Sequence, residues 1–97
     1  MHFANTALRE AYQKSDVAIR RWGAEGGPRY IQRVEALYAA TTFEDIRAVR
    51  AFRVHELKGG KKGEWAIRLG RRLRLMVILS DDEREVTIEE VSQHYGD

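Results

Sequence analysis

The residues with the clearest chemical potential in this sequence lie between Phe52 and Leu79. From position 53 to position 74 the chain carries eight lysines and arginines against two glutamates, together with one histidine, His55. An imidazole exchanges protons near neutral pH, and lysine and arginine stabilise negative charge on a phosphate. This combination of residue types indicates a site for a polyanion, and RNA fits it best.

Histidines and cations are also sufficient to cleave RNA without a metal ion. The ribose 2′-hydroxyl attacks its own phosphate, a base removes its proton, and an acid protonates the leaving 5′-oxygen. Cations stabilise the charge on the phosphate. The product carries a 2′,3′-cyclic phosphate. DNA is not cut, because it lacks the 2′-hydroxyl. A lone histidine is more often a structural or surface residue. His55 in combination with Lys58, Arg68 and Arg74 favours the catalytic interpretation.

Alternating apolar and polar residues predict strands that bring these side chains to one face of a sheet. The expected strands span residues 51–57, 64–70, 73–80 and 85–91, and the short breaks between them favour an antiparallel meander. Val91 is out of phase with its strand, which predicts a bulge near Glu90. The basic residues and the histidine that alternate with the apolar positions are Arg53, His55, Arg68, Arg72 and Arg74.

Helical periodicity precedes the strands. A first helix begins at Asn5 or Thr6, either of which can cap it, and Ser15-Asp16 interrupts its apolar stripe. A short second turn through Trp22 follows, although one continuous helix over residues 5–22 fits the pattern as well.

The helical half continues beyond a glycine-rich segment. Gly23, Gly26, Gly27 and Pro28 predict a loop, and residues 28–40 form the clearest helix. Thr42 and Asp45 predict the cap of one further short turn. Helices followed by strands give an α+β fold, in which the N-terminal helices pack on one face of a mainly antiparallel sheet of about four strands.

Composition sets the limits of this interpretation. The chain of 97 residues has room for one domain, residues 1–97, and one small core. It has no cysteine, no apolar run of ~20 residues and no signal-peptide pattern, so a cytoplasmic protein without a membrane association is expected. Residues 80–97 carry seven acids against one arginine, and an alternative is that this acidic end simply neutralises the basic strands.

Common enzyme motifs are missing. The sequence contains no phosphate-binding P-loop, no dinucleotide-binding glycine pattern and no H-E-x-x-H. The three histidines are far apart in sequence and no pair of acids has ligand spacing, so no metal site and no cofactor are predicted.

The basic stretch resembles a family signature. H-E-L-K-G-G-K-K-G-E-W-A-I-R-L, followed by R-L-R-L, is similar to the pattern H-x-L-K-G-x-x-x-G-x-W-[SA]-I of HigB-type toxins in the RelE/ParE superfamily. The ending E-E-V-S-Q-H-Y-G-D looks like the C-terminal strand of that family, which carries a histidine near the last residue. The sequence departs from the family at Ser92 and Gln93, where many relatives have an acid and a tyrosine, and at Leu73, where relatives often have Trp or Tyr.

The resemblance implies a toxin of a type II toxin–antitoxin system that cleaves mRNA in the decoding site of the ribosome. His55 and Lys58 match the active-site histidine and lysine, Arg74 matches the arginine of the third strand, and His94 matches the C-terminal histidine. Arg68 joins Lys58 and Arg74 in stabilising the phosphate. Contacts with RNA or the ribosome are expected from Arg53, Lys61, Lys62, Arg71 and Arg72.

The resemblance also implies a partner, a HigA-like antitoxin with a helix-turn-helix domain. Operator DNA is bound only through this antitoxin. The antitoxin could dock on the basic sheet face or on the helical face at Arg20, Arg21, Arg29 and Arg33, and the helical face is slightly favoured. Two other functions stay open. One is a ParE-like toxin that inhibits DNA gyrase by protein contact, and the other is a catalytically inactive module that binds RNA or the antitoxin.

Overall fold

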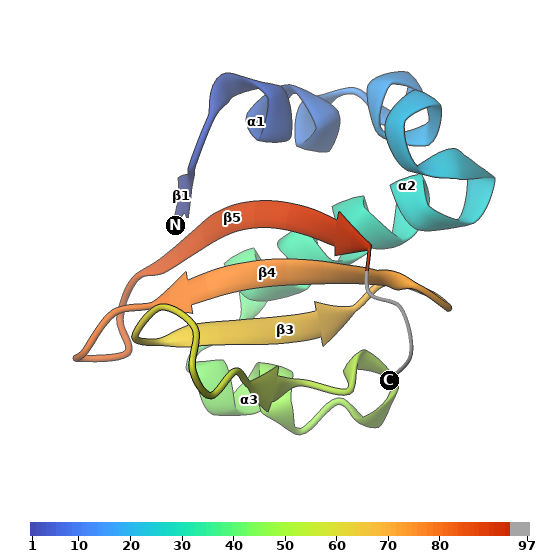
Figure 1. Ribbon diagram of the computed structural model, residues 1–97. Helices are drawn as coiled ribbons and strands as arrows, with labels where there is room; N and C mark the ends of the chain where they lie inside the picture. The colour runs from blue at the N-terminus through green and yellow to red at the C-terminus, as the bar shows by residue number, and fades with distance from the viewer. Residues whose placement is uncertain (94–97) are drawn as a thin grey trace.

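A five-stranded sheet covered on one face by helices forms the body of the protein. The computed structural model describes residues 1–93, and Figure 1 shows helices above, behind and below the sheet in that view. The elements are β1 (His2–Phe3), α1 (Thr6–Gln13), α2 (Ser15–Ala39), α3 (Phe43–Arg47), the 3-10 turn η1 (Arg50–Phe52), β2 (His55–Glu56), β3 (Glu64–Arg68), β4 (Leu73–Leu79) and β5 (Val86–Gln93). The strands run in the order β1-β5-β4-β3-β2. The prediction of an α+β fold with helices on one face of the sheet is therefore confirmed.

The antiparallel meander from β2 to β5 carries the register that positions the site. β3 pairs with β4 from Glu64 opposite Ile78 to Arg68 opposite Arg74. The β4–β5 register shifts between Met76 and Val77, so one residue of β5 bulges there, next to the predicted position at Glu90.

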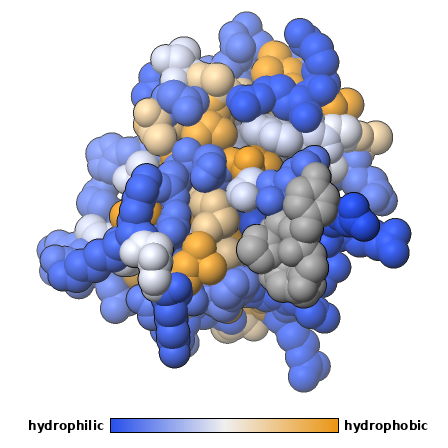
Figure 2. All heavy atoms as spheres, viewed as in Figure 1, coloured by the Kyte–Doolittle hydropathy of each residue, from blue (hydrophilic) through white to orange (hydrophobic). Residues whose placement is uncertain are grey.

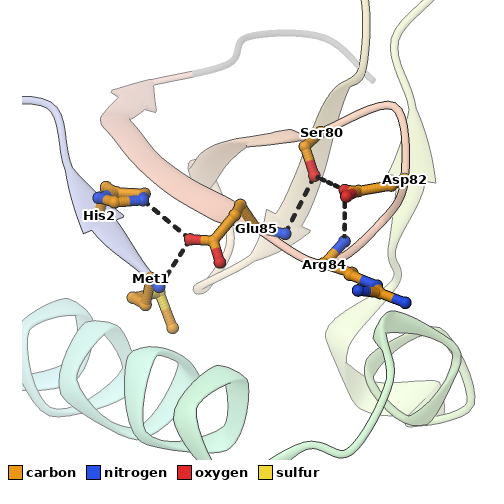
Figure 3. Close-up of polar contacts among 6 residues, drawn as sticks. All are labelled: Met1, His2, Ser80, Asp82, Arg84 and Glu85. Atoms are coloured by element: carbon orange, nitrogen blue, oxygen red, sulfur yellow. Dashed lines mark hydrogen bonds and ion pairs between the residues drawn. The ribbon is translucent and has the colours of Figure 1, made fainter.

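A short N-terminal strand is absent from the sequence-based prediction because two residues are too few to show alternation. β1 pairs in parallel with β5, which makes the sheet five-stranded and mixed rather than four-stranded. Figure 3 shows the polar contacts at this corner. The Glu85 carboxylate lies 2.8 Å from His2 Nε2 and 3.4 Å from the N-terminal ammonium group. These charges lower the pKa of Glu85 below its usual range.

The helical half departs from the predicted loop at residues 23–28. α2 is helical throughout apart from Gly23, whose φ of 85° turns the chain sharply, as Figure 1 shows. Gly26 and Gly27 are buried inside the helix and do not form a loop. A Cβ on Gly27 would lie 2.7 Å from the backbone of Ala18, so this glycine permits the two segments of α2 to touch.

The caps of the shorter helices agree with the sequence. Asn5 Oδ1 accepts a hydrogen bond of 2.9 Å from the backbone N–H of Leu8, which caps α1. The carboxylate of Asp45 accepts hydrogen bonds from the backbone N–H groups of Thr41 and Thr42 at the start of α3.

The prediction of a first strand over residues 51–57 is wrong for most of its length. Arg50–Phe52 is a 3-10 turn and Arg53 adopts a left-handed conformation with a φ of 45°. Only His55 and Glu56 pair with β3. Phe52 is buried by this turn and therefore mimics the inward residue of a strand in the sequence pattern.

The core lies between the helices and the covered face of the sheet. Tyr30 is fully buried in α2, and its hydroxyl donates a hydrogen bond of 2.7 Å to the carbonyl oxygen of Leu8 in α1. Burial also raises the pKa of this phenol. Three strands contribute Ile67, Leu75, Val77 and Ile88, and Leu69 joins them from the position just after β3.

Candidate active site on the open face of the sheet

The strand register aligns the candidate residues in two rows on the uncovered face. In the first row, His55 of β2 pairs with Ala66 of β3, which pairs with Met76 of β4, which pairs with Glu90 of β5. In the neighbouring row, Arg68, Arg74 and Ser92 follow each other across β3, β4 and β5.

Two adjoining depressions occupy this face. One, of about 160 Å³, has an apolar floor that includes Ala66 and Met76, which are only 2% and 8% exposed. The other, of about 190 Å³, is lined by His55, Arg53, Arg68, Arg71 and Arg74. His55 and Arg74 line both depressions. Figure 2, drawn from this side, shows hydrophilic side chains around a band of apolar atoms.

Local contacts orient the polar groups of the site. His55 is exposed, and its Nδ1 lies 3.3 Å from the backbone carbonyl oxygen of Arg53. Arg68 Nε donates a hydrogen bond of 3.1 Å to the carbonyl oxygen of Gly70 in the β3–β4 turn. An imidazole that lines this depression can exchange a proton with a group bound there, and the surrounding guanidinium groups can stabilise a phosphate.

Five of the predicted residues thus come together: Arg53, His55, Arg68, Arg71 and Arg74. Lys58 and Arg72 are exposed in the connections before β3 and before β4, and neither lines the two depressions. His94, the second predicted acid–base residue, lies outside the described residues.

The two lysines of the glycine-rich loop have acidic partners. Lys61 Nζ lies 2.5 Å from Glu89 Oε2, and Lys62 Nζ lies 3.4 Å from Asp81 Oδ1. The hydrogen bond to Glu89 raises the pKa of Lys61, and a hydrogen bond between Glu89 and Glu64 raises the pKa of Glu64. The alternative that the acidic C-terminal segment neutralises basic residues therefore applies to these lysines.

Glu90 is a site residue that sequence analysis missed, and it lines the apolar depression together with His55 and Arg74. Its carboxylate is the acidic group of that depression within residues 1–93. The bulge beside Glu90 hides the alternation that would place this residue on the open face, because a register shift interrupts the two-residue period of the strand. A carboxylate at this place can accept a proton, so Glu90 joins the candidate residues.

Two further properties concern metals and membranes. Within residues 1–93, the histidine, aspartate and glutamate side chains form no group of three or more that could hold a metal ion. None of the helices in this part of the chain is long and apolar enough to cross a membrane.

Comparison with known proteins defines the fold class. The helices and mixed sheet form a fold of the YoeB/ParE toxin type. A YoeB/ParE toxin from Agrobacterium tumefaciens is similar with a TM-score of 0.58 and 17% identity, over 98% of this chain and 100% of that chain. A YoeB–YefM complex from Staphylococcus aureus is similar with a TM-score of 0.53 and 15% identity, over 97% of this chain and 94% of that chain. No family model and no curated protein sequence matches the chain.

Proposed function

We propose that this protein is the toxin of a toxin–antitoxin system and that it cleaves mRNA on the ribosome. The observation that carries the proposal is the depression on the open sheet face, where one imidazole is surrounded by four arginines. One of the similar solved structures is a toxin by its name, and the HigB-like signature of the sequence indicates the same class.

In the proposed reaction, the RNA backbone lies across β2, β3 and β4 with the scissile phosphate over the arginines. His55 serves as one partner in proton transfer between the 2′-hydroxyl and the leaving 5′-oxygen, and His94 is proposed as the other. Arg68 and Arg74 stabilise the charge that develops on the phosphate, because guanidinium groups bind phosphate oxygens in pairs. Lys58 reaches the same phosphate from its loop, and the remaining basic residues hold the flanking RNA or the ribosome.

Primer extension on an mRNA, with and without ribosomes, tests the proposal. We expect new 5′ ends only when ribosomes and the wild-type protein are both present. Growth inhibition without any RNA cleavage would contradict the nuclease and favour a toxin that acts by protein contact on DNA gyrase, the ParE-like alternative.

A cognate antitoxin is part of the same proposal, since an active toxin would harm its own cell. One of the similar solved structures is a complex of two proteins, YoeB and YefM. We propose a HigA-like antitoxin with a helix-turn-helix domain as the partner. Co-purification of the chain with the product of an adjacent gene tests this part.

A further inference from the structure

A second basic cavity lies next to the candidate active site, on the helical side of the β3–β4 turn. This cleft, of about 550 Å³, is formed by α2, η1 and the turn between β3 and β4. The residues that line it include four arginines and one acid: Arg29, Arg33, Arg68, Arg71 and Glu25, with Ala51 and Gly70 completing the wall. We call it the arginine cleft.

Backbone carbonyls hold the arginines of the cleft in place. Arg33 Nε donates a hydrogen bond of 3.1 Å to the carbonyl oxygen of Arg68, and Arg29 Nη1 donates one of 3.4 Å to that of Leu69. Arg33 is only 8% exposed, and its guanidinium carbon lies 4.4 Å from the centre of the Phe52 ring. Burial, followed by the charge of Arg29, lowers the pKa of Arg33. The buried Arg33 and its neighbour Arg29 are therefore oriented toward the β3–β4 turn by contacts within the protein.

The charge of the cleft is not balanced within residues 1–93. The arginines at positions 20 and 47 form ion pairs with Asp16 and Glu44, but none of the four arginines of the cleft forms an ion pair in this part of the chain. Like charges held close together, one of them buried, are costly without a counter-charge. An anionic ligand would supply the counter-charge that these arginines lack within this part of the chain.

The cleft is continuous with the candidate active site. Arg68 and Arg71 line both the arginine cleft and the depression that contains His55. The basic track therefore runs from the face seen in Figure 1, around the β3–β4 turn, to α2 behind the sheet. A ligand that follows this track must carry negative charges at repeated positions, as a nucleic acid backbone does.

We propose that the arginine cleft is a second phosphate-binding site, which holds the RNA backbone beyond the phosphate that is cleaved. The proposal rests on the proposed function, because it takes RNA as the ligand of the neighbouring site. Arginine suits this role, since its planar guanidinium group binds two phosphate oxygens at once. Arg29 and Arg71 are exposed and contact the ligand, whereas the buried Arg33 contributes charge beneath them.

A pair of charge-matched variants tests the site. Arg29→Gln removes one charge that lines the cleft but not the depression with His55, and Arg20→Gln removes one exposed charge that is paired with Asp16 on the same helix. Binding of a single-stranded RNA with 2′-O-methyl riboses, which cannot be cleaved, is followed by fluorescence anisotropy at several salt concentrations. Thermal unfolding of each variant verifies the fold.

For the cleft variant we expect a slope of log affinity against log salt that is shallower by about 0.7 for each phosphate that the protein no longer binds. The control variant should keep the wild-type slope. Equal slopes for both variants would overturn the second site. A cleft variant that binds RNA like the wild type but binds the antitoxin more weakly would also overturn it. If the cleft variant loses RNA binding but the wild-type protein cuts no mRNA, the second site stands and the proposed function fails. If the wild-type protein binds no RNA, both fail.

Discussion

The glycine-rich loop and the arginine cleft both present cations beside the same sheet, but their surroundings differ. Lys61 and Lys62 extend into solvent and meet the carboxylates of Glu89 and Asp81. Three of the four arginines of the cleft donate hydrogen bonds to backbone carbonyl oxygens, and Arg33 also lies over an aromatic ring. None of the four meets a carboxylate at ion-pair distance within residues 1–93. A count of basic residues in the sequence treats the two regions alike. Their partners indicate that the arginines are the stronger site for a phosphate backbone.

The largest effect is expected where the basic track meets the imidazole. His55→Ala should slow mRNA cleavage ~10²–10⁴-fold, because one partner in proton transfer is removed. The melting temperature should not change, since the side chain is exposed and its removal leaves no core cavity. His2→Ala is the matched control, as His2 is also exposed but lies against Glu85. Equal cleavage rates in the two variants would remove His55 from the mechanism.

The comparison of the two basic regions is tested by removing two cations from each. Arg68→Gln with Arg71→Gln should make the salt dependence of RNA binding shallower by about 1.4, twice the value for one single-strand phosphate contact. Lys61→Gln with Lys62→Gln should change it by less than half as much, because these lysines already have acidic partners. Anisotropy titrations with the uncleavable RNA provide the slopes. A larger effect from the lysine pair would reverse the assignment.

The same comparison can be sharpened by freeing the lysines. Glu89→Gln with Asp81→Asn removes both carboxylate partners and leaves the cations in place. RNA binding should then become more salt-dependent, by about 0.7 for each lysine that reaches a phosphate. An unchanged slope would mean that the loop stays away from the RNA even when its charge is released.

Stability of the scaffold gives a further test, because the arginine cleft depends on the position of α2. Tyr30→Phe removes the buried hydrogen bond from the Tyr30 hydroxyl to the carbonyl oxygen of Leu8, which remains an acceptor within helix α1. The free energy of unfolding should fall by about 0.5–1.5 kcal/mol in urea titrations. Tyr38→Phe changes an exposed residue of the same type and should have little effect.

The smallest effect is expected at the sheet corner far from the basic track. Because the pKa of Glu85 is lowered in the folded state, its ion pairs stabilise the protein above the ordinary carboxyl pKa. This stabilisation disappears as the pH falls through the lowered pKa. Glu85→Gln should therefore lower the melting temperature slightly near pH 6 and have no effect in strong acid. A constant difference at all pH values would contradict an electrostatic origin.

Much of the fold follows from local sequence patterns. The alternation in β3 and β4 predicts which residues face the helices, and the helix over residues 28–40 follows from its apolar stripe. Glycines behave differently. Gly27 in isolation is typical of a helix breaker, but in the structure it allows two helical segments to touch. Such close approach is a tertiary property that no local pattern records.

The candidate site is predictable only in part, for the same reason. His55, Arg68 and Arg74 can be found because alternation and residue type coincide in their strands. The position of Arg29 and Arg33 beside the β3–β4 turn cannot be predicted from local patterns. Both residues belong to α2, and they donate hydrogen bonds to carbonyl oxygens that lie far along the chain. Glu90 is hidden by the bulge in β5. Contacts between distant segments, rather than residue types, decide these cases.

The most direct test of an RNA-cleaving site on the open sheet face uses the chemistry of the substrate. An mRNA is first cut by the wild-type protein on ribosomes to map a cleavage position, and the nucleotide before that position is then replaced by its 2′-deoxy form. Attack by the 2′-hydroxyl predicts that the unmodified mRNA yields a 2′,3′-cyclic phosphate end and that the deoxy-substituted mRNA stays intact at that position. Cleavage of the substituted mRNA at an unchanged rate, or a product with a free 3′-hydroxyl, would contradict it.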